Sequence, residues 1–217
     1  NLEWFNNMKS LLLLLLATVA TQAKEDRSYV YEVRVWTQPN YQGMYHDFNE
    51  KVPYLSSYNL DNAISSIKVK GVWLFYADPE YNTYVTSLVH WAWGLNYKEN
   101  LHAIDDQISS LRYAGSQSNC NEAGYNLYEG EMFTKKDLYQ TNDIPDLSQF
   151  HQDVKSVIII GQSSWTFCEQ ANYNGRCVCL SAELHDSDYL SRLDVGFYQR
   201  ISDLYLYNVK SVRKGCY

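Results

Sequence analysis

The chain has 217 residues, of which 46% are hydrophobic and 15% aromatic, and a formal net charge of -7 from 25 acidic and 18 basic side chains. It contains no basic run, so it lacks the electrostatic footprint of a nucleic-acid-binding protein. Its longest apolar run is far shorter than the roughly 20 residues that cross a membrane, so we expect no membrane span.

The N-terminal residues are expected to lie outside the fold. Met8-Lys9-Ser10 is followed by six leucines and then by small residues up to Ala23. A basic start, a short apolar run and small residues before a break are typical of a secretory signal peptide. We therefore predict a translated leader over residues 1–7, a signal peptide over 8–23 and a secreted, extracellular mature chain.

Beyond this segment, short stretches rich in aromatic and β-branched residues alternate with clusters of Asn, Asp, Gly and Ser. Examples are YVYEVRVWTQPNYQG from Tyr29, VWLFYADPEYN from Val72 and SVIIIGQSSWTFCEQANYNG from Ser156. This alternation is typical of many short antiparallel strands joined by tight turns. It predicts an all-β sandwich or barrel.

An internal repeat has two aromatic positions five residues apart, with glycine two residues after the second. The copies are Trp36-TQPN-Tyr41-Gln-Gly43, Tyr76-ADPE-Tyr81-Asn-Thr83, Cys168-EQAN-Tyr173-Asn-Gly175 and a worn Phe133-TKKD-Leu138-Tyr-Gln140. Two aromatic rings at this spacing can pack on each other over a tight loop, and glycine supplies the positive φ of the turn. We interpret the chain as four units that pair two and two.

Each unit also has a serine where an apolar strand begins. These serines are Ser65, Ser109, Ser156 and Ser211. A hydroxyl at this point can hydrogen-bond the backbone of the folded hairpin and hold it on the sheet.

The hairpins and the later serines resemble the βγ-crystallin family, over nearly the whole mature chain. The resemblance implies an all-β fold of two βγ-crystallin-like domains, each a sandwich of two Greek-key motifs. We expect the first domain over residues 28–116, a linker over 117–126 and the second domain over 127–217.

Two hexapeptides in the first domain carry the oxygen ligands that Ca²⁺ prefers. They are Asp61-Asn62-Ala63-Ile64-Ser65-Ser66 and Asp105-Asp106-Gln107-Ile108-Ser109-Ser110, with side-chain oxygens at positions one, two and five. The apolar fourth residue of each can anchor its loop in the core. One loop alone supplies too few ligands for a calcium site.

Both hexapeptides match the N/D-N/D-x-x-S/T-S pattern of calcium-binding βγ-crystallins. The resemblance implies two Ca²⁺ ions in the first domain, each between the loop of one motif and the aromatic hairpin of its partner. The implied ligands are Asp61, Asn62, Ser65, Asp105, Asp106 and Ser109, with backbone carbonyls near Thr37 and Ala77. The alternative is that the serines have only a structural role, because family members that bind no metal also carry them.

The second domain departs from the calcium pattern. Its equivalents are Gln152-Asp153-Val154-Lys155-Ser156-Val157 and Tyr207-Asn208-Val209-Lys210-Ser211-Val212, with a lysine beside each serine. An ammonium group repels a divalent cation. We expect these serines to be structural, and we hypothesise that disulfides there offset the loss of metal.

The chain has an odd number of cysteines, all in the linker or the second domain: Cys120, Cys168, Cys177, Cys179 and Cys216. In an oxidising compartment they favour disulfides, whose connectivity the sequence leaves open. The unpaired thiol is either free or joins another chain, which allows a homodimer or a covalent partner. A zinc site is disfavoured, because C-x-C has no matching Cys or His pair.

The sequence contains no motif of a catalytic nucleophile or metalloprotease, so we expect no enzyme and no catalytic residues. Our main interpretation is a secreted structural protein stabilised by calcium. The alternative is a secreted binding or defence protein on the same scaffold: an inhibitor, an antimicrobial or a toxin partner. The aromatic stretch VHWAWGLNY, residues 89–97, then has two interpretations, core packing or a surface for a glycan or protein ligand.

Overall fold

The structure is a computed structural model that describes residues 30–148, 153–183 and 193–217. The predicted leader and signal peptide lie outside the described residues. Within those ranges, no helix has the length and apolar character needed to cross a membrane.

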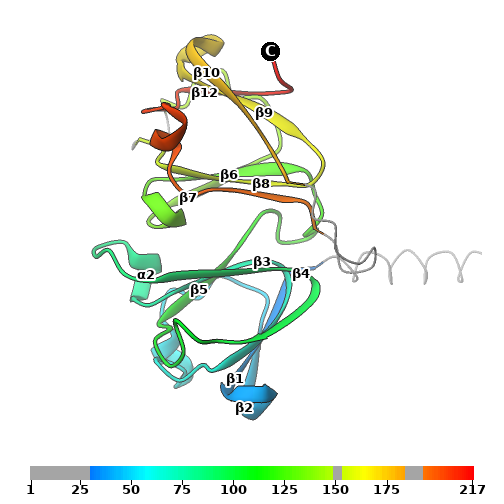
Figure 1. Cartoon of the computed structure of the whole chain (residues 1–217), viewed down its shortest axis with the longest axis vertical. Coiled ribbons are helices and arrows are strands. Elements are labelled where there is room, and N and C mark those ends of the chain that lie inside the picture. The colour runs from blue at the N-terminus through cyan, green and yellow to red at the C-terminus, as the bar shows by residue number, and fades with distance from the viewer. Residues whose placement is uncertain (1–29, 149–152, 184–192) are drawn as a thin grey trace, which may run out of the picture.

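The regular secondary structure of the described chain is mainly β-strand, arranged as two halves stacked along the long axis (Figure 1). The strands of the first half are β1 (Glu32–Gln38), β2 (Gln42–Phe48), β3 (Ser66–Tyr76), β4 (Val89–Asn100) and β5 (Ser110–Ala114). Those of the second half are β6 (Gly124–Tyr128), β7 (Asp137–Gln140), β8 (Ser156–Ile160), β9 (Ser164–Gln170), β10 (Asn174–Ser181), β11 (Val195–Tyr198) and β12 (Ser211–Lys214). The short helical turns are η2 (Pro39–Tyr41), η3 (Leu55–Tyr58), α2 (Pro79–Asn82), η4 (Glu131–Phe133), η5 (Ala171–Tyr173) and η6 (Ile201–Leu204).

In the first half, the long strand β3 belongs to both layers of the sandwich. Its first part pairs antiparallel with β1, and its second part, from Val72, pairs antiparallel with β5. The change occurs at Gly71, where φ is +95° and the pairing with β4 shifts register. A Cβ at this position would lie 2.1 Å from the Tyr31 ring, so only glycine fits where the strand changes layer.

The second half repeats the arrangement with two separate antiparallel sheets. One has the strand order β11-β8-β6-β7 and the other β10-β9-β12. The two halves are therefore two antiparallel sandwiches of Greek-key type: the alternation of strands and turns predicted a sandwich or barrel, and the resemblance implied the Greek keys. The predicted domain limits stay predictions; β6 begins at Gly124, inside the segment expected to be the linker.

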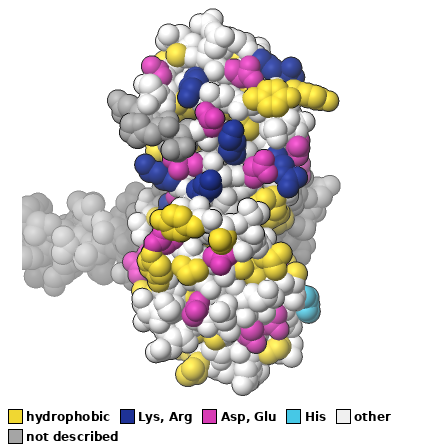
Figure 2. Space-filling model, turned by 90° about the vertical axis from the view of Figure 1, so that its left-hand side faces the viewer, with side chains coloured by type: hydrophobic (Ala, Val, Ile, Leu, Met, Phe, Trp, Pro, Cys, Tyr) yellow, Lys and Arg dark blue, Asp and Glu magenta, His cyan; other side chains and the backbone are white. Residues whose placement is uncertain are grey.

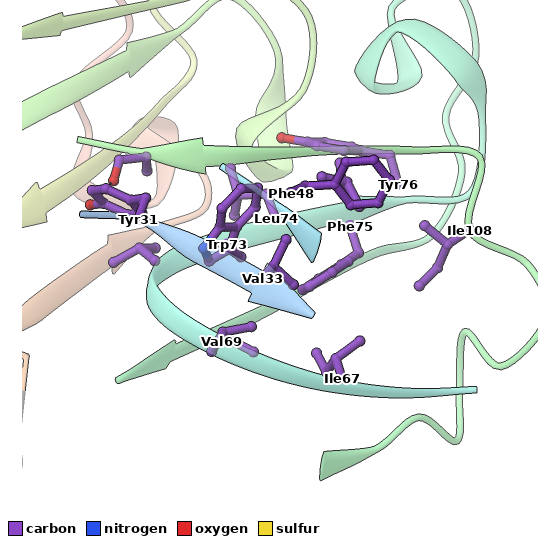
Figure 3. Close-up of a cluster of buried hydrophobic side chains, with 14 of the residues drawn as sticks. Tyr31, Val33, Phe48, Ile67, Val69, Trp73, Leu74, Phe75, Tyr76 and Ile108 are labelled. Carbon is purple, nitrogen blue, oxygen red and sulfur yellow. The ribbon is translucent and has the colours of Figure 1, made fainter. Parts of the chain in front are cut away.

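The core of the first half is built from alternate residues of its strands. Val33 and Val35 of β1 and Ile67 and Val69 of β3 are fully buried. Figure 3 shows these β3 side chains with Val33 and the Trp73 ring in one cluster, together with Ile108 from the loop before β5. Period-two alternation thus places every second side chain inside.

The two halves share an apolar interface. The buried cluster of the first half continues into Tyr128, Phe133, Ile158, Ile160, Leu193 and Val195 of the second. Trp91 packs against Phe133 and Phe197 at ring distances of 5.4 and 5.8 Å, and Trp93 lies 4.9 Å from Phe197. Core packing therefore accounts for Trp91 and Trp93, which join the two halves.

A fully buried arginine crosses the same interface. Arg112 of β5 donates hydrogen bonds to the Phe133 carbonyl at 2.6 Å and the Lys135 carbonyl at 2.7 Å, both in the second half. It also lies 3.2 Å from the Asp137 carboxylate and donates from Nε to the Tyr76 hydroxyl at 2.9 Å. Burying a charge is costly unless it is paired and hydrogen-bonded, and Arg112 satisfies both conditions.

Buried tyrosines line this interface and make the fold sensitive to alkali. Burial raises the pKa of Tyr31, Tyr76 and Tyr128 well above 10.0, and raises that of Tyr81 to about 12. Because the folded state holds these phenols neutral, their contribution to stability is complete below pH 10 and is lost as the pH rises through the folded pKa values.

We therefore expect cooperative unfolding in alkali, with phenol ionisation appearing together with the loss of β-structure. The measurement is a parallel titration by ultraviolet absorbance and circular dichroism. Ionisation of all tyrosines around pH 10 with the fold intact would contradict it.

The five cysteines form two disulfides and one free thiol. Cys168–Cys177 links β9 to β10, and Cys179–Cys216 ties β10 to the C-terminal segment, so both staple the second half. Cys120 is free and fully buried, and burial raises the pKa of its thiol to about 11. A buried, protonated thiol does not support the predicted covalent dimer.

Candidate functional site

The aromatic hairpins fold as the repeat predicted, with one correction. Trp36 packs edge-on against Tyr41 at 5.4 Å, and Tyr76 against Tyr81 at 5.6 Å. The fourth unit replaces its first ring with a half-cystine, because Cys168 is bonded to Cys177.

The third hairpin was predicted to begin at Phe133, and this was wrong. The ring pair there is Tyr128 with Phe133, at 5.6 Å, so Phe133 is the second aromatic residue. The glycine position of the repeat is then Lys135, which adopts φ +64°. The spacing Tyr-x4-Phe carried the signal, but the missing glycine concealed it.

The serines that hold the hairpins are also displaced by one residue from the prediction in the first half. The Ser66 hydroxyl donates to the Gln38 carbonyl at 2.7 Å and accepts from the Tyr41 amide at 3.1 Å. Ser110 makes the same two bonds to Asp78 and Tyr81. In the second half, Ser156 and Ser211 do this as predicted. The preceding serines, Ser65 and Ser109, are therefore not needed for the hairpins.

The two hexapeptide loops lie against each other. The Asp106 amide donates to the Ile64 carbonyl at 3.1 Å, and the Asn62 amide donates reciprocally to the Ile108 carbonyl at 3.0 Å. Asn62 and Asp106 both adopt left-handed backbone conformations, with φ of 52° and 51°. Asn and Asp tolerate this conformation better than other non-glycine residues.

The contact between loops brings predicted ligands together across the motifs. The Ser65 hydroxyl donates to Asp106 Oδ1 at 3.2 Å. In the equivalent position of the other motif, Asn62 lies beside Ser109. The Asn62 amide donates to the carbonyl of Ile108, which directly precedes Ser109. Ile64 and Ile108 are fully buried, as predicted for the anchors of the two loops.

The serine of each loop also contacts the hairpin of its own motif through the backbone. The Ser65 amide donates to the Trp36 carbonyl at 2.9 Å, and the Ser109 amide to the Tyr76 carbonyl at 2.8 Å. The reason is strand pairing, since each serine leads into a strand that pairs with the strand carrying its own aromatic residue. Thr37 and Ala77, the predicted carbonyl ligands, directly follow these two acceptors.

The donor set fits a hard cation. Asp61, Asn62 and Asp106 are exposed, whereas the Ser65 and Ser109 side chains are 3% and 4% exposed. Asp105 Oδ1 is buried and has no hydrogen-bond partner among the described residues. A buried carboxylate oxygen without a donor is costly, and a bound cation would satisfy it.

In residues 30–148, 153–183 and 193–217, no group of three or more His, Cys, Asp or Glu side chains is placed to hold a metal. The ligands available at the loops are hydroxyl, amide, carboxylate and backbone carbonyl oxygens. This mixture is the one that calcium accepts.

In the second half, lysine occupies the position of the predicted ligand serine. The Lys155 amide donates to the Tyr128 carbonyl and the Lys210 amide to the Cys168 carbonyl, both at 2.8 Å, as the Ser65 and Ser109 amides do to Trp36 and Tyr76 in the first half. The lysines therefore replace the serines at position five and do not merely adjoin them. The predicted alignment of the second-half sites was one residue out of register, and Gln152 lies outside the described residues.

Comparison with known families matches the chain twice to the Beta/Gamma crystallin family, over residues 32–114 and 125–213. No curated protein sequence matches the chain.

Among solved structures, the chain is similar to geodin, a beta-gamma crystallin from Geodia cydonium, with a TM-score of 0.65 and 21% identity over 86% of this chain and 99% of that one. It is also similar to a beta gamma crystallin from Ciona intestinalis, with a TM-score of 0.34 and 18% identity over 42% of this chain and 99% of that one. A third match is protein S complexed with calcium, with a TM-score of 0.33 and 15% identity over 86% of this chain and 100% of that one.

Proposed function

The chain belongs to the βγ-crystallin family, and from this premise we propose that it is a structural protein whose first domain binds two Ca²⁺ ions that stabilise its fold. Members of this family are generally structural proteins without catalytic activity. The observation that carries the proposal is the contact between the two hexapeptide loops, in which Ser65 of one meets Asp106 of the other.

Each proposed site combines residues from both loops. The first would use Ser65, Asp106 and the carbonyl of Thr37; the second would use Ser109, Asn62 and the carbonyl of Ala77. Asp61 and Asp105 add negative charge at the two loop entries. Bound calcium would supply positive charge that neutralises these carboxylates and ties the two motifs together.

The two sites are proposed to differ in affinity. Asp106 offers a carboxylate where Asn62 offers a neutral amide, and a charge attracts a divalent cation more strongly than a dipole does. The site of Ser65 and Asp106 should therefore fill first. Both sites are expected in the range of extracellular modules, with dissociation constants of about 10⁻⁴ to 10⁻³ M.

Isothermal titration of the chain with calcium tests this proposal. We expect two bound ions, and an increase in the free energy of unfolding of about 2.7 kcal/mol per ion at 100 times its dissociation constant. The adjacent serines provide a matched pair of variants. Ser65→Ala should lose one ion, whereas Ser66→Ala should keep both.

In the absence of calcium, the order of the two variants is expected to reverse, with Ser66→Ala having the larger effect on stability. Ser66→Ala should lower the free energy of unfolding by about 1–3 kcal/mol, because it leaves buried hairpin groups unsatisfied. Ser65→Ala should have the smaller effect. An unchanged melting temperature on adding chelator to the calcium-equilibrated chain would refute the proposal.

We also propose that the protein works in an extracellular, oxidising compartment. The two disulfides of the second half support this, since disulfides persist in such compartments and are rare in the cytosol. Extracellular calcium also suits sites of modest affinity, so structural stabilisation is a better fit than rapid signalling.

A further inference from the structure

A trough on the surface lies at the junction between the two halves, and its lining includes Asp78, the residue after the proposed calcium ligand Ala77. Its polar part has a volume of about 410 Å³ and lies between the first-half segment 82–87 and the second-half residues Glu129, Lys135, Lys155 and Arg200. Its apolar part, about 310 Å³, is lined by Tyr54, Asp78, Pro79, Glu80, Tyr84 and Val85. The two parts share Tyr84 and Val85 as lining residues and are here together called the junction trough.

The first-half wall of the junction trough is held rigidly. Asn82 is 1% exposed, and its amide donates to the carbonyls of Ser87 and Leu88 while its oxygen accepts from the Asp78 amide. These bonds fix both ends of the loop that carries Tyr84. The trough therefore has a preformed wall, which reduces the entropic cost of binding.

The second-half wall is fixed by contacts to the first half and within itself. The Lys135 amide donates to the Tyr81 carbonyl at 3.2 Å, which joins the hairpins on the two sides. Arg200 pairs with Glu131 at 2.9 Å, so this arginine and this carboxylate neutralise each other. Lys155 lies 3.6 Å from the Asp153 carboxylate, and Lys135 and Glu129 add one charge of each sign, so the polar part has no single dominant charge.

The apolar part of the junction trough exposes large hydrophobic side chains to solvent. Tyr84 is 83% exposed, Val85 52% and Tyr54 43%. Figure 2 shows hydrophobic side chains gathered just below the junction on this face, with Lys and Arg side chains above them. Clustered exposed apolar side chains beside polar groups mark a binding surface.

A buried acceptor in the same part lacks a donor. Asp78 Oδ2 is buried, and among the described residues it has no hydrogen-bond partner. Glu80, next to it in the lining, adds a second carboxylate. A ligand that satisfies this region must donate hydrogen bonds to carboxylates while it covers tyrosine rings.

We propose that the junction trough binds a saccharide chain. A pyranose ring presents an apolar C–H face to Tyr84 and Tyr54, and its hydroxyl groups donate to Asp78 and Glu80. Further sugar units extend into the polar part, where hydroxyl groups accept from Lys135 and Lys155 and donate to Glu129. A peptide matches the apolar part less well, because each residue offers one backbone N–H donor where a sugar unit offers several hydroxyl groups.

Titration calorimetry with defined hexasaccharides tests the proposal. The probes are cellohexaose, chitohexaose, mannohexaose and a heparin-derived hexasaccharide, which separate neutral from acidic chains. We expect at least one to bind saturably, at one site per chain. Tyr84→Ala and Asp78→Asn should each weaken that binding by about tenfold or more.

The matched control is Tyr45→Ala, since Tyr45 is 59% exposed on β2, at the outer edge of its sheet. This variant should bind the saccharide with unchanged affinity. Because Tyr84 is so exposed, its truncation should leave the melting temperature unchanged. The proposal fails if no hexasaccharide binds at millimolar concentration, if the trough variants bind like the parent chain, or if a displayed peptide library alone yields ligands that depend on Tyr84.

Discussion

Replacing Arg112 with methionine is expected to lower the free energy of unfolding by about 3–5 kcal/mol, the usual cost of removing one partner of a buried ion pair. Methionine fills much of the arginine volume but leaves the Asp137 carboxylate and the carbonyls of Phe133 and Lys135 without this donor. Urea denaturation measures the effect. Because Arg112 joins the halves, we also expect the single transition to separate into two.

The control is Arg34→Met, which removes another arginine and aspartate pair. Arg34 and Asp47 are paired at 2.6 Å, but their side chains are 37% and 41% exposed. Exposed pairs contribute about 0–1 kcal/mol, so this variant should unfold almost like the parent chain. Equal midpoints for the two variants would show that Arg112 does not couple the halves.

Arg112 also links the interface to the proposed calcium site. It lies on β5, which begins directly after the loop of Asp106 and Ser109. Its guanidinium group lies 4.5 Å from the Tyr81 ring, and Ser110 holds the Tyr81 amide. The start of β5 therefore connects three features: the loop proposed to bind calcium, the hairpin of Tyr81 and the contact with the second half.

The fold was largely predictable from the sequence because it depends on local patterns. Alternating strands and aromatic residues five apart are fixed by side-chain direction and ring packing, which act over a few residues. The hairpins at Trp36 and Tyr76 were found for this reason. Where a side chain departs from the local rule, as Lys135 does in the place of a glycine, the pattern failed.

The candidate site was less predictable because its contacts join distant residues. The hexapeptides predicted the ligand types, but a double serine has two possible registers. Only the hydrogen bonds of Ser66 show that the second serine holds the hairpin, which leaves Ser65 as the proposed calcium ligand. Likewise, the sequence around Trp91 and Trp93 does not show whether these rings contact a ligand or, as in the structure, Phe197 of the other half.

The same assignment of the second serine to the hairpin changes the interpretation of the loops in the second half. With Lys155 and Lys210 in place of the proposed ligand serines, each second-half loop has a cationic side chain instead of a hydroxyl group at this position. The contribution that calcium is proposed to make in the first half must then come from another source. Both disulfides lie in the second half: one links β9 to β10, and the other joins β10 to the C-terminal segment.

Reduction of the disulfides is accordingly expected to destabilise the second half selectively. In the loop-entropy model, closing loops of the observed sequence separations, 9 and 37 residues, contributes about 3 and about 4 kcal/mol, respectively, when each acts alone. The loss should appear as early disappearance of hydrogen-exchange protection in β9, β10 and β12, while β1 and β3 stay protected.

Chelation of calcium provides the reciprocal control on the same chain. It should lower protection around residues 61–66 and 105–110 and leave the disulfide-linked strands unaffected. Cys168→Ala with Cys177→Ala should reproduce part of the effect of reductant without altering calcium binding. If reductant instead lowered protection equally in both halves, the two halves would share one source of stability, and the division between metal and disulfides would be wrong.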